Sequence, residues 1–223
     1  MRIFNNMNRN RIPGWLVKCI WLLVLLLLFL AYFPLNSLRE PIHSLELTVD
    51  DRIPLLPPFV FPYLSLYVLL LVSMWRFLKA ETRIFAIAAL AISLDLVISY
   101  LVFLFYQTQV ERPAILGSDV SSSILRMVYS HDKPFNAFPS LHTSLSALLA
   151  LLWGRVGSRI QPAIAVWAVF IIASTLFTKQ HYIADVFGGM AVALISYFCA
   201  TKLGTFAAGR AAGHFPFRRN RSR

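Results

Sequence analysis

Charged residues are scarce in this sequence, and acidic residues are the scarcest of them. Only 14% of the 223 residues are charged, with 10 Asp and Glu against 21 Lys and Arg, whereas 58% are hydrophobic. A soluble domain carries about a quarter charged residues. The composition therefore excludes an ordinary soluble protein and indicates an integral membrane protein. The net charge of +11 comes without a basic patch interleaved with aromatic residues, so we expect no nucleic-acid partner.

Cysteines are also few. The two in the chain, Cys19 and Cys199, lie in apolar stretches near opposite ends of the sequence. This spacing argues against a disulfide framework and against a thiolate metal site. Sustained polar–apolar alternation and internal repeats are missing as well, so neither a strand-rich nor a repetitive fold is indicated.

The chain has long apolar stretches instead, and a membrane-spanning helix needs roughly 20 mostly apolar residues. Six candidates cover about residues 15–34, 59–78, 84–106, 138–153, 161–178 and 183–201. We predict an all-α, polytopic membrane bundle of about six transmembrane helices that forms one domain over residues 1–223. The first stretch ends in FLAYFPLNS, which lacks the small-residue pattern of a signal-peptide cleavage site, so we expect a retained helix.

Six spans place both termini on one side of the membrane. All but six of the 21 Lys and Arg residues fall on that side, including those of loops 77–83 and 154–160. Because positively charged loops stay in the cytoplasm, we predict a multi-pass protein of the cell or inner membrane with cytoplasmic termini. Residues 204–223 would then form a basic cytoplasmic tail that faces lipid headgroups.

The opposite, extracytoplasmic face collects polar residues from three distant parts of the chain. Arg112 follows the third apolar stretch, His142 opens the fourth, and Lys179, His181 and Asp185 lie between the fifth and the sixth. The six-span topology brings all of these positions to one face. We therefore expect the functional site there.

The two histidines have a functional and an ordinary interpretation. His181 and Asp185 are four residues apart, so on a helix the carboxylate could fix one ring nitrogen and leave the other free as a nucleophile or base. Alternatively, the pair simply caps the sixth span at the lipid headgroups. His142 follows Pro139 and Ser140, which are typical of a helix start whose free amides bind phosphate. An ordinary helix start with an exposed histidine is the alternative.

The neighbouring cations favour an anionic ligand. Arg112 offers a planar donor fork suited to phosphate, and Lys179 offers a point charge two residues before His181. Together with a nucleophile and a proton donor, these are the parts that phosphoryl transfer needs. A metal site is the competing interpretation, because two histidines and a carboxylate are a common ligand set. The two cations would repel a metal ion, so we expect neither a metal nor a cofactor.

These segments resemble the motifs of the type 2 phosphatidic acid phosphatase (PAP2) superfamily. The family pattern is a Lys, six residues and Arg-Pro; then Pro-Ser-Gly-His; then Ser-Arg, five residues, His, three residues and Asp. The matching segments are Arg112-Pro113, Pro139-Ser140-Leu141-His142, and Ser174-Thr175 with His181 and Asp185. They lie within residues 84–201, which the resemblance implies are a PAP2-like catalytic core. The departures are Phe105 at the Lys position, Leu141 at the Gly position and Thr175 at the Arg position.

The resemblance implies a role for each catalytic candidate. His181 would attack phosphorus and become phosphorylated, and Asp185 would orient it. His142 would protonate the departing oxygen and then deprotonate the incoming acceptor.

The resemblance also implies which groups hold the phosphate. Arg112 and the amides of Ser140 and Leu141 would bind phosphate oxygens. Lys179 is added to this set because of its proximity to His181, and it would supply the charge that the Thr175 position lacks.

The resemblance implies a metal-independent membrane lipid phosphatase that acts on a lipid phosphate ester. FPSLHTS with TKQHYIAD looks closest to the branch that includes inositol phosphorylceramide synthase, so a lipid headgroup phosphotransferase is the alternative. A transporter with a proton path and a non-catalytic membrane scaffold are further alternatives. The partners expected in either enzymatic case are a lipid phosphate substrate and membrane lipids.

Two polar features lie outside this set. Asp95 stands alone inside the third apolar stretch, where an acid is costly, and we expect it to form an interhelical hydrogen bond. The loop over residues 35–58 lies on the same face as the histidines, and we expect it to be solvated or to lie flat on the membrane.

Overall fold

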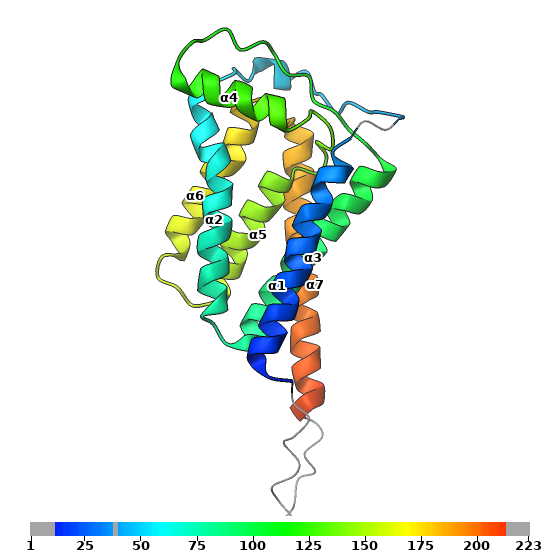
Figure 1. Cartoon of the computed structure of the whole chain (residues 1–223), viewed down its shortest axis with the longest axis vertical. Coiled ribbons are helices and arrows are strands. Elements are labelled where there is room, and N and C mark those ends of the chain that lie inside the picture. Colours follow the sequence, from blue (N-terminus) through cyan, green and yellow to red (C-terminus); the bar gives the residue numbers. More distant parts are fainter. Residues whose placement is uncertain (1–11, 38–39, 213–223) are drawn as a thin grey trace, which may run out of the picture.

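The structure is a computed structural model that describes residues 12–37 and 40–212, with side chains up to residue 204. Seven α-helices form in this part of the chain (Figure 1). They are α1 (Gly14–Leu35), α2 (Val60–Leu78), α3 (Thr82–Phe105), α4 (Val120–His131), α5 (Leu141–Arg155), α6 (Gln161–Phe177) and α7 (Ile183–Ala212), with short 3-10 turns η1 (Asp50–Arg52) and η2 (Pro57–Phe59). All but α4 coincide with the six apolar stretches, so the predicted all-α bundle is confirmed.

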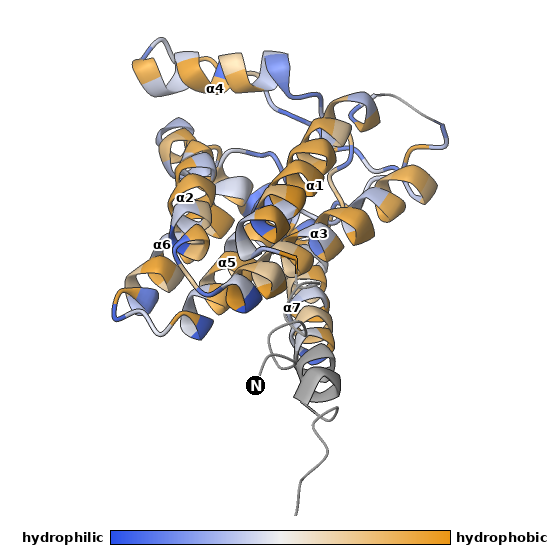
Figure 2. Cartoon of the chain, turned by 60° about the horizontal axis from the view of Figure 1, so that its bottom comes forward, coloured by the Kyte–Doolittle hydropathy of each residue, from blue (hydrophilic) through white to orange (hydrophobic). Residues whose placement is uncertain are grey.

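Within the described residues, four helices are long and apolar enough to cross a membrane, namely α1, α2 with η2, α3 and α7. α5 has 15 residues and α6 has 17, or about 23 and 26 Å at 1.5 Å per residue, against a hydrocarbon core of about 30 Å. The helices consist mostly of hydrophobic residues (Figure 2), and many of their large apolar side chains are exposed. Leu23, Leu27 and Phe33 of α1, for example, are all exposed. Surfaces of this kind are stable against lipid rather than water.

α3 and α5 form the interior of the bundle. α3 packs against α1 and α7, whereas α5 packs against α6 and α7 and also contacts α2 and α3. Phe85, Ile92 and Phe103 of α3 are fully buried as a result. Because α5 is surrounded, the residues at its start lie in the middle of one end of the bundle.

Polar side chains link the interior helices. The Ser144 hydroxyl of α5 donates a 2.8 Å hydrogen bond to the carboxylate of Asp95 on α3, and both residues are buried. The expected interhelical hydrogen bond of Asp95 is therefore confirmed. The indole nitrogens of Trp153 and Trp167 similarly donate to Ser73 and Ser65 of α2.

α4 lies across one end of the bundle, next to η2 and α2 (Figure 1). Its N-cap residue is Asp119, whose carboxylate accepts the amide of Ser122 at 3.0 Å. One face of α4 is apolar and carries Leu125 and Val128 into a small cluster with Tyr63. α4 thus covers the end of the bundle without crossing it.

The loop between α1 and α2 is more than a solvated connection, which corrects the expectation for residues 35–58. Asp50 is 2% exposed. Its carboxylate accepts the amides of Leu47 and of Ile183, the first residue of α7. The loop therefore packs onto the start of α7 and helps to enclose that end of the bundle.

α1 begins and α7 ends at the other end of the bundle (Figure 1). This is the arrangement that an even number of spans requires. Residues 204–212 of the expected tail continue α7, whereas residues 213–223 lie outside the described residues. The basic cytoplasmic tail stays a prediction.

Candidate active site

Three segments that are distant in the sequence meet at the end of the bundle across which α4 lies. They are the extended chain after α3, the start of α5 and the turn between α6 and α7. The ring centroids of His142 and His181 lie 6.4 Å apart. Arg112 donates to the side chain of Gln180, the residue before His181. The fold thus brings the predicted Arg and His residues to one place.

The turn from α6 to α7 positions His181. α6 ends in a Schellman motif, in which Gln180 donates its amide to the Thr175 carbonyl and Lys179 donates to the Leu176 carbonyl. Lys179 has a φ of 51°, so it takes the left-handed conformation at a position where Gly is usual. The amide of His181 also donates to Thr175, at 3.2 Å. The reversal therefore fixes the backbone of His181.

Asp185 belongs to the first turn of α7. Its carboxylate accepts the amide of Tyr182 at 2.8 Å, which is the acidic half of a capping box. His181 precedes the helix, which begins at Ile183. This corrects the prediction that His181 and Asp185 share one helix face, because the reversal after α6 brings them together instead.

The hydrogen bond of His181 defines the tautomer of the neutral ring. Nδ1 lies 2.9 Å from the carbonyl oxygen of Ala137. A carbonyl only accepts, so in the neutral ring Nδ1 carries the proton and Nε2 presents a lone pair. The hydrogen bond expected from Nδ1 to Asp185 goes to Ala137, and Oδ2 of Asp185 lies 3.5 Å from Nδ1. Nε2 forms no hydrogen bond with any residue that the structure describes.

His142 lies in the first turn of α5 and is enclosed by aromatic rings. It stacks on Tyr63 of α2 with ring centroids 3.9 Å apart, and Tyr67 contacts its edge. Nε2 of His142 is buried and lacks a hydrogen-bond partner among the described residues. A polar atom buried in this way is costly and is typical of a site that a ligand completes. A substrate oxygen can reach this atom only when the surrounding side chains move.

Arg112 is held by groups on both sides of its guanidinium. One nitrogen donates to the Asp132 carbonyl at 2.6 Å and the other to the side-chain oxygen of Gln180. The guanidinium also lies 4.7 Å from the centre of the Tyr129 ring. These contacts fix the positive charge next to the turn that carries His181.

The start of α5 has the predicted cap. Oγ of Ser140 accepts the amide of Thr143 at 3.3 Å. The amide of Ser140 donates to the Asp185 carbonyl at 3.1 Å, so this predicted phosphate donor is already bonded within the protein. The first-turn amides of Leu141 and His142 form no hydrogen bond with the described residues. They are the donors that an anion would meet.

The groups available to bind a ligand at this site are mostly positively charged or hydrogen-bond donors. In the part of the chain that the structure describes, no three His, Cys, Asp or Glu side chains gather closely enough to hold a metal ion. The Arg112 guanidinium and the free amides at the start of α5 suit phosphate oxygens instead.

Comparison with known families shows which family the chain belongs to. Residues 28–199 match the profile of the PAP2 superfamily. The chain belongs to the PAP2 superfamily. The resemblance drawn from the motifs is confirmed. The catalytic core over residues 84–201 stays a prediction.

One curated protein is similar to this chain over a short segment. It is the inositol phosphorylceramide synthase catalytic subunit aur1 of Schizosaccharomyces pombe, which is 35% identical over 69 residues. That segment covers 31% of this chain and only 16% of the yeast protein. No solved structure matches the chain.

The structure places the residues at which this PAP2 chain departs from the family pattern. Phe105, at the family's Lys position, is 84% exposed at the end of α3, so its side chain packs little against the rest of the protein. Thr175 is buried and supplies its carbonyl to the α6–α7 turn. The Lys179 ammonium donates to the Asp50 carbonyl at 2.8 Å. A phosphate contact from Lys179 would require that bond to break.

Sequence reasoning missed the residues that enclose the site, and Asp132 is the most important of them. Its carboxylate accepts the Tyr32 hydroxyl at 3.0 Å and the Asn36 amide at 2.7 Å. Burial raises the pKa of Asp132, and the nearby charge of Arg112 opposes this effect. The sequence feature that could have identified Asp132 is its position at the start of DKPFNAFPSLH, which ends in the second motif.

Proposed function

We propose that this PAP2 protein is a metal-independent membrane lipid phosphatase that cleaves a lipid phosphate ester through a phosphohistidine at His181. The observation that carries the proposal is the hydrogen bond from Nδ1 of His181 to Ala137, which leaves Nε2 with a free lone pair. The charge of Arg112 and the free amides of Leu141 and His142 supply the positive field that phosphoryl transfer needs.

The first step forms the phosphohistidine. Nε2 of His181 attacks phosphorus while the bond from phosphorus to the lipid oxygen breaks. His142, in its protonated form, gives a proton to that oxygen, so the lipid leaves as an alcohol. Asp185, whose Oδ2 lies 3.5 Å from Nδ1 of His181, stabilises the positive charge that develops on the ring.

The second step releases phosphate. His142 is now neutral and takes a proton from water. The water oxygen bonds to phosphorus as the nitrogen–phosphorus bond breaks. Inorganic phosphate leaves, and both imidazoles return to their starting protonation states.

A lipid headgroup phosphotransferase is the second candidate function. The similarity to an inositol phosphorylceramide synthase subunit favours it. The same residues serve in this case, because a lipid alcohol replaces water in the second step and His142 removes its proton.

The test uses the full chain purified in detergent, with labelled lipid phosphates in EDTA, and with or without lipid alcohols. Free phosphate and headgroup transfer are followed together, which separates the two functions. We expect His181→Asn to lower turnover by at least about 1,000-fold. His131→Asn is the matched control, because His131 is exposed at the end of α4. Turnover that survives His181→Asn, or that EDTA abolishes, would contradict the proposal.

A further inference from the structure

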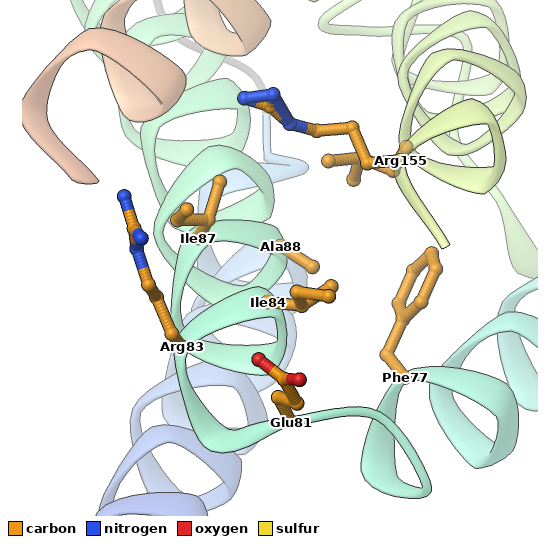
Figure 3. Close-up of a pocket in the computed structure, with 8 residues that line it drawn as sticks. Phe77, Glu81, Arg83, Ile84, Ile87, Ala88 and Arg155 are labelled. Carbon is orange, nitrogen blue, oxygen red and sulfur yellow. The ribbon is translucent and has the colours of Figure 1, made fainter. Parts of the chain in front are cut away.

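A cavity of about 300 Å³ lies at the end of the bundle away from the histidines (Figure 3). It is bounded by the end of α2, the start of α3 and the end of α5, and its lining residues are Phe77, Glu81, Arg83, Ile84, Ile87, Ala88, Leu152 and Arg155. His142 and Arg155 lie near opposite ends of α5, about 20 Å apart at 1.5 Å per residue. The cavity is therefore separate from the candidate active site.

The floor of this cavity is apolar and well packed. Phe77 and Leu152 are almost fully buried, and Phe77 packs against Trp153. Ile87 lies against Gly204 of α7, where even a single added carbon would come within 2.5 Å. Close packing of this kind gives a fixed apolar surface, which suits a hydrocarbon chain better than a polar solute.

Two arginines from different helices form the rim. Arg83 extends from α3 and Arg155 from α5 along the two sides of the cavity (Figure 3). Both are exposed. Among the residues that the structure describes, Arg83 makes a single long hydrogen bond, of 3.4 Å, to the Gly204 carbonyl, and the Arg155 guanidinium lies 5.8 Å from the centre of the Tyr197 ring. Both guanidinium groups therefore keep donors for an anion.

Two neighbouring cations, Lys18 and Arg76, are already bonded to backbone carbonyls of the protein. Lys18 donates to the carbonyls of Leu78 and Ala80, at 2.7 and 3.1 Å. Arg76 donates to the Val156 carbonyl at 3.1 Å. These bonds hold the loops around the cavity and leave Arg83 and Arg155 as the rim charges.

The N-terminus of α3 adds to the positive electrostatic field in the cavity, whereas the carboxylate of Glu81 reduces it. Glu81 is the N-cap residue of α3, but its side chain does not cap the helix. The first-turn amides, which carry the positive end of the helix dipole, are thus not satisfied by a side chain. The Glu81 carboxylate itself weakens the attraction for an anion.

We propose that this cavity binds an anionic phospholipid, with its phosphate between Arg83 and Arg155 and its acyl chain on the apolar floor. A basic rim above an apolar floor matches an amphipathic anion, and basic pockets between membrane helices bind acidic headgroups. A neutral lipid would leave the arginines unused, and free phosphate would leave the floor uncovered.

The experiment measures the thermal unfolding midpoint of the full chain in neutral detergent as phosphatidylglycerol is added. Phosphatidylcholine and inorganic phosphate are titrated in parallel. We expect phosphatidylglycerol to raise the midpoint more than either of them. The double variant Arg83→Gln with Arg155→Gln should bind it about 30-fold more weakly, since each basic residue near an acidic headgroup contributes about fivefold.

Two further variants keep the test decisive if the double variant folds poorly. Arg159→Gln removes an exposed arginine from the loop after α5, outside the cavity lining, and should leave binding unchanged. Glu81→Gln removes the opposing charge and should strengthen binding several-fold. Equal shifts with phosphatidylcholine or with inorganic phosphate would overturn the proposal, and so would a Glu81→Gln variant that binds no more tightly.

Discussion

Arg112 shows how far the candidate site depends on the shape of one side chain. Its planar guanidinium bonds to the Asp132 carbonyl and to Gln180 at the same time, and it lies over the ring of Tyr129. A lysine ammonium keeps the charge but cannot repeat this set of contacts. The position of the charge beside His181 is therefore specific to arginine.

We predict that Arg112→Lys lowers kcat/KM for a lipid phosphate by about 100-fold, because a displaced charge stabilises the transition state less. Arg126→Lys is the matched control, since Arg126 is exposed and donates to the carbonyls of Ile115 and Gly117. Steady-state kinetics with both variants check the prediction. Equal losses in the two variants would contradict it.

Asp132 should make stability depend on pH. Burial raises its pKa above 3.8, so the folded protein binds this proton more tightly than the unfolded chain. The stabilisation is complete at low pH and is lost as pH rises from 3.8 through the raised pKa. Asp132→Asn keeps an acceptor for Tyr32 and Asn36, and it should flatten this part of the curve of unfolding midpoint against pH. Parallel curves for the two proteins would show that Asp132 does not titrate in this way.

At the scale of elements, the contact between α5 and α7 sets the relation of the two histidines. Gly189 of α7 lies against the start of α5, and an added carbon would come within 2.6 Å of the Ser140 carbonyl oxygen and 2.9 Å of the Thr143 side chain. Backbone atoms cannot rotate away, so a larger residue must move one helix. His142 lies in the first turn of α5, and His181 lies just before α7. The packing of these two helices therefore sets the distance between the two histidines.

We predict that Gly189→Ala lowers kcat/KM by about 100-fold, the effect of a shift of about 1 Å in an active site. Gly154→Ala in α5 is the control, because the nearest atom to its added carbon is 4.0 Å away. Kinetics and unfolding midpoints are measured for both variants. Full activity in Gly189→Ala would mean that the helix contact does not position the histidines.

The sequence predicted the apolar helices better than the connections between them. Length and composition are sufficient to find membrane spans, whereas α4 is a short amphipathic helix with several serines and escaped prediction. The α6–α7 reversal was also missed, because Lys179 stands where a Schellman turn usually carries Gly. The site residues were located by motif, but the bond from His181 to Ala137 depends on a turn that sequence spacing does not reveal.

At the scale of the whole molecule, the bundle of six apolar helices has two ends that differ in their chemistry. The histidines lie at the α4 end, and the arginine-rimmed cavity lies at the end where α1 begins and α7 ends (Figure 1). The excess of basic residues at the cavity end predicts that this end faces the cytoplasm. The candidate active site would then open to the extracytoplasmic side.

Cysteine labelling tests this orientation. Cys19 and Cys199 are first replaced by Ser, and single cysteines are placed at Leu116, which is 94% exposed in the loop after α3, and at Arg159 in the loop after α5. We predict that a membrane-impermeant thiol reagent labels Leu116→Cys in intact cells, and Arg159→Cys only after permeabilisation. The reverse pattern would invert the topology.

The most direct test of the central claim is to trap the phosphorylated enzyme. The full chain is mixed with a lipid phosphate labelled at phosphorus and quenched within one turnover, and the labelled residue is located by mass spectrometry. We predict an acid-labile, base-stable phosphoryl group on His181 that is absent from His181→Asn. A phosphoryl group on another residue, or turnover through an enzyme that is never labelled, would contradict the account.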